Sequence, residues 1–154
     1  MGAKLSKNFV TVSFLAAILW LSGCEYKRAG NFAYINDGKL GYREQIELPC
    51  DSGGTDELVV LALRYTDEYP YRTISMEISL EERDGTKQKD TVCVELNDIT
   101  GKRLGHGLGG SYQIEKVSKL LFPPDSCMIK VCQIMRSDTV KGIEMIGVLS
   151  KKQE

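Results

Sequence analysis

The stretch Ile74-Ser75-Met76-Glu77-Ile78-Ser79-Leu80-Glu81 alternates apolar and polar side chains without a break. A period of two is the pattern of a β-strand with one face in the core and the other in water. The same alternation returns over residues 92–97, and Asp84-Gly85 between the two segments is typical of a hairpin turn. The sequence therefore predicts an antiparallel hairpin with one buried face.

Two further segments are apolar at nearly every position rather than at alternate ones. They cover residues 58–63 and 128–134. Strands of this kind lie in the centre of a sheet with both faces covered. Residues 42–48 are expected to form an earlier, half-buried strand, and residues 143–149 the last strand.

From Cys24 onward, no window of 11 or more residues shows a helical stripe. Short strands separated by turn signals about every ten residues are typical of an all-β sandwich. We therefore expect an all-β fold over residues 33–154. The expected architecture is an antiparallel β-sandwich of the immunoglobulin-like or jelly-roll-like kind.

The start of the chain has the pattern of an exported lipoprotein. Lys4 and Lys7 precede an apolar run, and Leu21-Ser22-Gly23-Cys24 has the form of a bacterial lipobox. The apolar run is about 13 residues long, whereas roughly 20 are needed to span a bilayer. We expect residues 1–23 to be a signal peptide that is cleaved before Cys24, whose thiol accepts the lipid. The alternative is an ordinary secretory signal with an incidental cysteine.

Residues 24–32 are expected to form a short lipidated tether that holds the domain close to a membrane. One acyl chain anchors a protein only marginally, but two or three make dissociation negligible. No acidic cluster follows Cys24 directly, which favours the periplasmic face of the outer membrane, with the inner membrane as the alternative. The formal net charge of −1 and the absence of a basic, aromatic-rich patch do not suggest a nucleic-acid partner.

Four cysteines besides Cys24 are available for pairing in an oxidising compartment. Two bridges could form in three connectivities, although the last two cysteines, five residues apart, would point to opposite faces of one strand. We expect these cysteines to pack mainly as small apolar side chains, and a bridge, if one forms, to involve Cys50 because it is predicted to lie in a turn. Their spacing fits no zinc pattern, so no metal or cofactor is expected. The four are Cys50, Cys93, Cys127 and Cys132.

Gly105-His106-Gly107-Leu108-Gly109-Gly110 has the composition of a phosphate-binding loop. Such loops lead into a helix whose amides face the anion, whereas an extended segment follows here. We interpret the glycines as positions that need a positive φ. His106 has no orienting carboxylate or nucleophile at a fixed spacing, so it is expected to be an exposed loop residue and the chain is not expected to be an enzyme.

Arginine and aromatic side chains gather where predicted strands end. Arg64, Tyr69 and Tyr71 surround the end of one buried strand, and Arg136 follows another. Such residues are enriched at binding hot spots, so we predict a candidate interaction surface made of these four. In the structural alternative, the two tyrosines cap the open end of the sandwich and Arg64 pairs with an acidic neighbour.

Several short segments occur in a fixed order along the chain. They are Leu63-Arg64, Tyr69-Pro70-Tyr71, Leu104-Gly105-x-Gly107-Leu108-Gly109-x-x-Tyr112, Phe122-Pro123, Gln133-x-Met135-Arg136-x-Asp138 and Gly142-Ile143-x-x-x-Gly147. In this order, and after a lipobox, they resemble the gliding-motility lipoprotein GldH family of the Bacteroidetes. The resemblance implies a non-enzymatic envelope lipoprotein of a family needed for surface gliding in motile species, a process tied to type IX secretion. Relatives also occur in bacteria that do not glide, so envelope assembly or secretion is the alternative role. It carries over no catalytic residue, and only the acylated Cys24 as a functional one.

Three hypotheses follow. The first is a lipid-anchored interaction component with envelope protein partners. The second is a periplasmic lipoprotein that holds a glycan or lipid in a concave, aromatic-lined cleft of several hundred Å³. The third, an enzyme, is the weakest, because no pair of carboxylates is fixed by spacing.

Overall fold

The computed structural model describes residues 30–51 and 57–153. The expected signal peptide 1–23, Cys24 and most of the expected tether lie outside the described residues. Apart from the 3-10 turn η1 (Asn36–Gly38), the elements are strands. They are β1 (Gly30–Tyr34), β2 (Lys39–Gly41), β3 (Ile46–Cys50), β4 (Glu57–Thr66), β5 (Thr73–Glu82), β6 (Lys87–Glu95), β7 (His106–Leu108), β8 (Ser111–Leu121), β9 (Cys127–Gln133), β10 (Thr139–Lys141) and β11 (Ile143–Lys152).

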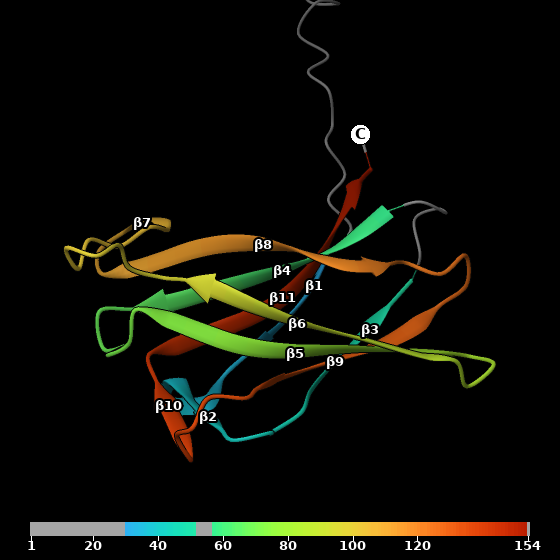
Figure 1. Ribbon diagram of the computed structural model, residues 1–154, viewed down its shortest axis with the longest axis horizontal. Helices are drawn as coiled ribbons and strands as arrows, with labels where there is room; N and C mark the ends of the chain where they lie inside the picture. The colour runs from blue at the N-terminus through green and yellow to red at the C-terminus, as the bar shows by residue number, and fades with distance from the viewer. Residues whose placement is uncertain (1–29, 52–56, 154) are drawn as a thin grey trace, which may run out of the picture.

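Two antiparallel sheets face each other (Figure 1). The five-stranded sheet has the order β1-β11-β4-β8-β7, and the four-stranded sheet has the order β3-β9-β5-β6. The pairs are nested, because β5 pairs with β6, β4 with β8, β3 with β9 and β1 with β11. This is the topology of a long hairpin rolled into a jelly roll. The all-β sandwich is confirmed, and the jelly roll is the one of the two expected kinds that is observed.

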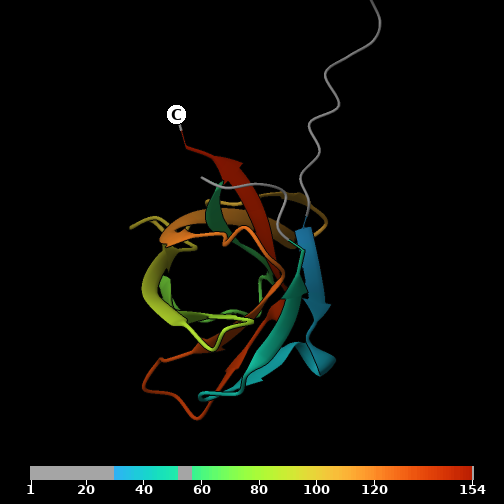
Figure 2. The ribbon, with the colours of Figure 1, turned by 90° about the vertical axis from the view of Figure 1, so that its right-hand side faces the viewer.

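The sandwich is closed along both sides, and seen end-on its strands run around a ring (Figure 2). On one side β8 approaches β6, where the Lys119 amide donates a hydrogen bond of 2.8 Å to Asp90 Oδ2. On the other side β1 approaches β3, where Asn31 Nδ2 donates to the Pro49 carbonyl. The small β2–β10 ribbon continues the same nesting beyond the main sheets.

The predicted hairpin is confirmed in β5 and β6. Burial alternates along β5 with a period of two, and the two strands pair from Thr73↔Glu95 to Glu81↔Lys87. Gly85 takes a φ of 88° in the turn, and the Thr86 amide donates to Asp84 Oδ1 at 2.8 Å. The positive φ explains why glycine stands at this turn.

The two continuous apolar segments form β4 and β9, which are central strands as predicted. Side chains from both sheets meet between them in one core. Its fully buried members include Leu61 and Leu63 of β4, Ile78 and Leu80 of β5, and Ile129 of β9.

The earliest part of the domain differs from expectation in two places. Residues 42–48 do not form one strand, because Arg43 takes a φ of 55° and Tyr42 is half exposed. β3 therefore begins only at Ile46. At the start, β1 begins at Gly30 and pairs with β11, so residues 30–32, expected in the tether, belong to the first strand.

Cys50 also lies in a different place from the one expected. It is the last residue of β3 and is 6% exposed, rather than a residue of a turn. Its side chain faces the core because Leu48 and Cys50 share one face of the strand.

Candidate functional site

The two tyrosines of the predicted interaction surface have different roles. Tyr69 is 1% exposed, and its hydroxyl donates a hydrogen bond of 2.8 Å to the Thr73 carbonyl. Its ring contacts Tyr71 edge to face, with 5.7 Å between the centroids. Burial raises the pKa of Tyr69 far above its usual value. Tyr69 is therefore a capping residue of the sandwich end, and Tyr71, 40% exposed, is the one that reaches the surface.

The two arginines lie on different parts of the molecule. Arg64 is half-buried on the outer face of the five-stranded sheet, in register between Met145 and Gln113. Arg136 is exposed in the turn between β9 and β10, which shares the end of the sandwich with the Tyr71 turn. The structure thus brings Tyr71 and Arg136 to one end, places Arg64 on a sheet face and buries Tyr69.

Arg103 organises this end of the sandwich, and the sequence analysis missed it. Its Nε donates to Asp67 Oδ1 at 3.1 Å, and its NH2 donates to the Asp67 carbonyl at 2.8 Å. Its NH1 donates to Asn97 Oδ1 at 2.8 Å and to the Tyr69 carbonyl at 3.3 Å. Multiple hydrogen bonds from one planar guanidinium fix geometry. Arg103 thus joins residues 97–103 to the turn that follows β4.

Tyr65 fixes the same loop from the core side. Its hydroxyl donates to the Leu96 carbonyl at 2.7 Å and accepts from the Gly105 amide at 3.1 Å. The Arg103 guanidinium lies 5.9 Å from the centroid of the Tyr65 ring, within cation–π range. No sequence spacing pairs Tyr65 with residues 31 to 40 positions later, so the available signal was a polar ring at the end of a largely apolar strand.

A local turn shapes the tip of the loop. Asp98 Oδ1 accepts hydrogen bonds from the Thr100 amide at 2.7 Å, the Thr100 hydroxyl at 2.7 Å and the Lys102 amide at 2.9 Å. These bonds, the Thr100 hydroxyl first, lower the pKa of the Asp98 carboxyl. Gly101 takes a φ of 85°, and Ile99 at the tip is 83% exposed.

The glycine-rich segment forms a second fixed loop at this end. Gly109 and Gly110 have φ values of 68° and 82°, which confirms the interpretation that the segment needs positive φ. A Cβ on Gly107 would lie 1.9 Å from the Ser111 carbonyl oxygen, so close backbone pairing of β7 with β8 also requires glycine. His106 is exposed as expected, but it lies in β7 rather than in a loop. Leu108 is 94% exposed.

We define the loop-end surface as the exposed side chains carried by these turns and loops: Tyr71, Ile99, Leu104, Leu108 and Arg136. The β7–β8 turn is tied to the rest because the Asp67 amide donates to the Gly110 carbonyl at 3.3 Å. Exposed apolar side chains that gather in one patch mark protein-binding sites, and tyrosine and arginine are enriched among binding hot spots.

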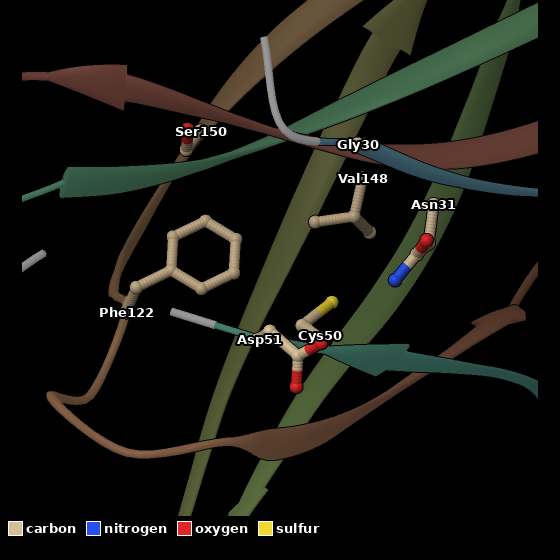
Figure 3. Close-up of a pocket in the computed structure, with 7 residues that line it drawn as sticks. All are labelled: Gly30, Asn31, Cys50, Asp51, Phe122, Val148 and Ser150. Atoms are coloured by element: carbon tan, nitrogen blue, oxygen red, sulfur yellow. The ribbon is translucent and has the colours of Figure 1, made fainter. Parts of the chain in front are cut away.

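A small hollow lies at the opposite end of the sandwich, where β1 begins (Figure 3). Its volume is about 270 Å³, below the usual range for ligand pockets. Phe122 is the one aromatic residue among the described residues that line it. A wider hollow of about 640 Å³ beside β7 and β8 is lined by Leu104, His106, Gln113, Ile114 and Glu115, with no Phe, Tyr or Trp among them. Neither hollow is the large aromatic-lined cleft that the ligand-binding hypothesis requires. The residues that line the smaller hollow are Gly30, Asn31, Cys50, Asp51, Phe122, Val148 and Ser150.

Within residues 30–51 and 57–153, no group of three or more His, Cys, Asp or Glu side chains is placed to hold a metal ion. No helix in that part of the chain is long and apolar enough to cross a membrane. The exposed side chains of the loop-end surface are apolar groups, an aromatic ring and a cation.

The fold defines a class of protein, a jelly-roll β-sandwich whose loops carry exposed apolar side chains at one end. The comparison of sequences is more specific, because residues 45–149 match the GldH lipoprotein family. The chain belongs to that family. No curated protein sequence matches it.

Two solved structures show similarity to the chain. One is Eiger TNF from S. frugiperda, at 11% identity and a TM-score of 0.42, covering 82% of this chain and 95% of that chain. The other is the functional form of the mosquito-larvicidal Cry4Aa toxin from Bacillus thuringiensis, also at 11% identity and a TM-score of 0.42. That match covers 73% of this chain but only 19% of the toxin chain.

Proposed function

We propose that this chain is a lipid-anchored, non-enzymatic interaction component of the envelope machinery for gliding motility, linked to type IX secretion. Membership of the GldH lipoprotein family supports the proposal, together with the lipobox ending at Cys24. The lipid on Cys24 would hold the domain at a membrane, preferably the periplasmic face of the outer membrane. The loop-end surface would then bind an envelope protein partner.

The positions of the two ends of the sandwich support separate roles, with anchoring at one end and partner binding at the other. Gly30, where the described chain begins, pairs with Leu149, which pairs with Val60 near the start of β4. The loop-end surface lies beyond the other end of β4, where Thr66 pairs with Ser111. A tether that enters at the first end leaves the second end free to face away from the bilayer.

The observation that carries the proposal is the bracing of the exposed apolar side chains. Arg103 and Tyr65 make buried or half-buried hydrogen bonds whose effect is to hold the Ile99 loop against the sandwich. Ordering these residues before binding lowers the entropy lost on association. A loop that only faced solvent would need neither an exposed apolar side chain at its tip nor these hydrogen bonds to hold it in one conformation.

The test is crosslinking of the full-length protein in its native membrane, followed by affinity purification and mass spectrometry. The variants Ile99→Asp and Leu108→Asp should each reduce recovery of the crosslinked partner by tenfold or more. Val117→Asp is a matched control, because Val117 is also an exposed apolar residue but lies on the outer sheet face. Equal recovery from all variants with unchanged thermal unfolding would contradict the proposed surface.

Anchoring is tested separately with Cys24→Ser. The variant should accumulate as an uncleaved precursor that takes up no labelled fatty acid, whereas the native chain is processed and labelled. Separation of the two membranes on a density gradient then assigns the native chain to one of them. Processing and acylation of the Cys24→Ser variant would show that the lipobox interpretation is wrong.

A further inference from the structure

Four cysteines lie among the described residues, and two of them face each other. Cys50 ends β3, Cys127 begins β9, and the two are partners in the last register position of this antiparallel pair. Both are buried, at 6% and 8% exposure.

The register places this pair within bridging distance. Residues directly opposite each other in an antiparallel pair have Cα atoms about 4.5 or 5.5 Å apart, and their side chains share a face. Disulfides span Cα separations of about 4.4 to 6.8 Å. Either kind of opposed pair therefore satisfies the backbone requirement without movement of a strand.

The other two cysteines fail the same requirement. Cys93 is opposite Ser75, and Cys132 is opposite Glu77, so strand β5 separates them. Two strand spacings amount to about 9.6 Å, beyond the roughly 7 Å limit for a bridge. The geometry of the described cysteines thus selects one pairing.

We propose that Cys50 and Cys127 form a disulfide in the exported protein. The proposal rests on the export proposed above, because an oxidising compartment must supply the oxidant. That oxidant is a protein dithiol–disulfide oxidase. One cysteine thiolate attacks the donor disulfide and releases a donor thiol. The second then attacks the mixed disulfide, so that the donor leaves as a dithiol with two electrons and two protons.

Burial bears on when the bridge forms. Desolvation raises the pKa of the Cys50 thiol to about 12, and burial also raises the pKa of Cys127. Since the thiolate is the reactive form, the folded, reduced pair reacts slowly, and oxidation is expected while the chain folds. A hollow of about 400 Å³ lined by both cysteines leaves an approach from solvent at this end.

The bridge would join an edge strand of the four-stranded sheet to its central neighbour. β3 is at the edge of that sheet, and Cys50 lies where the chain leaves it. A covalent link there prevents β3 from detaching at the end near the tether. It also closes a long loop of chain, which restricts the unfolded state.

The experiment is alkylation of the native protein, extracted from its membrane and denatured without reductant, followed by peptide mapping. We expect a crosslinked peptide that joins Cys50 to Cys127, with Cys93 and Cys132 alkylated. Cys50→Ser and Cys127→Ser should each free one additional thiol, whereas the control Cys93→Ser should keep the bridge. Four alkylated thiols in processed, acylated protein, or any other pairing, would overturn the proposal and leave the anchoring intact.

If the native protein were unprocessed and cytosolic, the proposed export would fail instead. Refolding of the full chain in a glutathione redox buffer then decides the pairing without a cell compartment. Formation of the Cys50–Cys127 bridge supports the geometry, and any other result overturns it. A reductant should lower the thermal midpoint of the oxidised native chain but not that of the double variant Cys50→Ser/Cys127→Ser.

Discussion

The outer faces of the two sheets differ in the chemistry of their side chains. On the four-stranded sheet, lysines and glutamates alternate across the strands, and Lys130 pairs with Glu47 at 3.3 Å and with Glu81 at 3.7 Å. On the five-stranded sheet, part of the outer face is small or apolar instead, formed by Val60 and Ala62 of β4 with their register partners Leu149 and Gly147 of β11. Val60, Ala62 and Leu149 there are between 0 and 5% exposed, although no second sheet formed by residues 30–51 and 57–153 covers them.

The difference shows that a sheet face can be buried by its own side chains. Phe32 of the edge strand β1 lies over Gly147 of β11, where an added Cβ would come within 2.1 Å of the ring. Gly147 and Ala62 are register partners on the same face. The missing side chain of Gly147 makes room for the Phe32 ring, which covers this part of the sheet face.

The largest effect is expected when a charge enters the apolar face. Ala62→Asp places a carboxylate at a position with no exposed surface, at a cost of about 3 to 5 kcal/mol in the free energy of unfolding. Urea denaturation measures this cost.

The matched change on the other face is Ser79→Asp. Ser79 stands in register between Lys130 and Lys89, so the new charge meets two cations and the effect should stay within about 0.5 kcal/mol. Equal costs for the two variants would mean that the faces do not differ in the way described.

A smaller effect is expected from filling the space beneath Phe32. Gly147→Ala would displace the ring and should cost about 1 to 3 kcal/mol by overpacking. In a Phe32→Ala background the same substitution should cost much less, because its collision partner is gone. The double-mutant cycle should give a coupling of at least about 0.5 kcal/mol. Additive costs would refute the proposed contact between these two positions.

These faces also show how far the sequence predicts the fold. The alternation in residues 74–81 identifies β5, its buried side and the hairpin, because each neighbour along a strand faces the opposite way. The apolar run in β4 predicts a covered central strand but not its cover. Phe32, which covers Gly147 beside β4, lies in a strand too brief to show a period, and it was expected to belong to the tether.

The candidate site, like the fold, can be predicted from the sequence only where the residues form a local pattern. The aromatic-rich turn after β4 is recognisable from its residue types, but they do not separate buried Tyr69 from exposed Tyr71, because turn residues have no fixed period. No sequence pattern marks Arg103, whose partner Asp67 lies 36 positions earlier in the chain. Contacts of this kind depend on which strand ends meet, and only the nested topology of the sheets sets that.

The smallest effect is expected at the charged face. Lys130→Met removes ion pairs to two glutamates, of which Glu47 is largely exposed, so solvent screens the attraction. A double-mutant cycle with Glu47→Gln should give a coupling of about 0.2 to 1 kcal/mol at low ionic strength, and the coupling should fall toward zero in 1 M salt. Thermal unfolding at the two salt concentrations measures it. A coupling that survives high salt would mean that Lys130 acts through packing of its methylene stem. The charged face would then be stabilised by apolar packing, as the apolar face is.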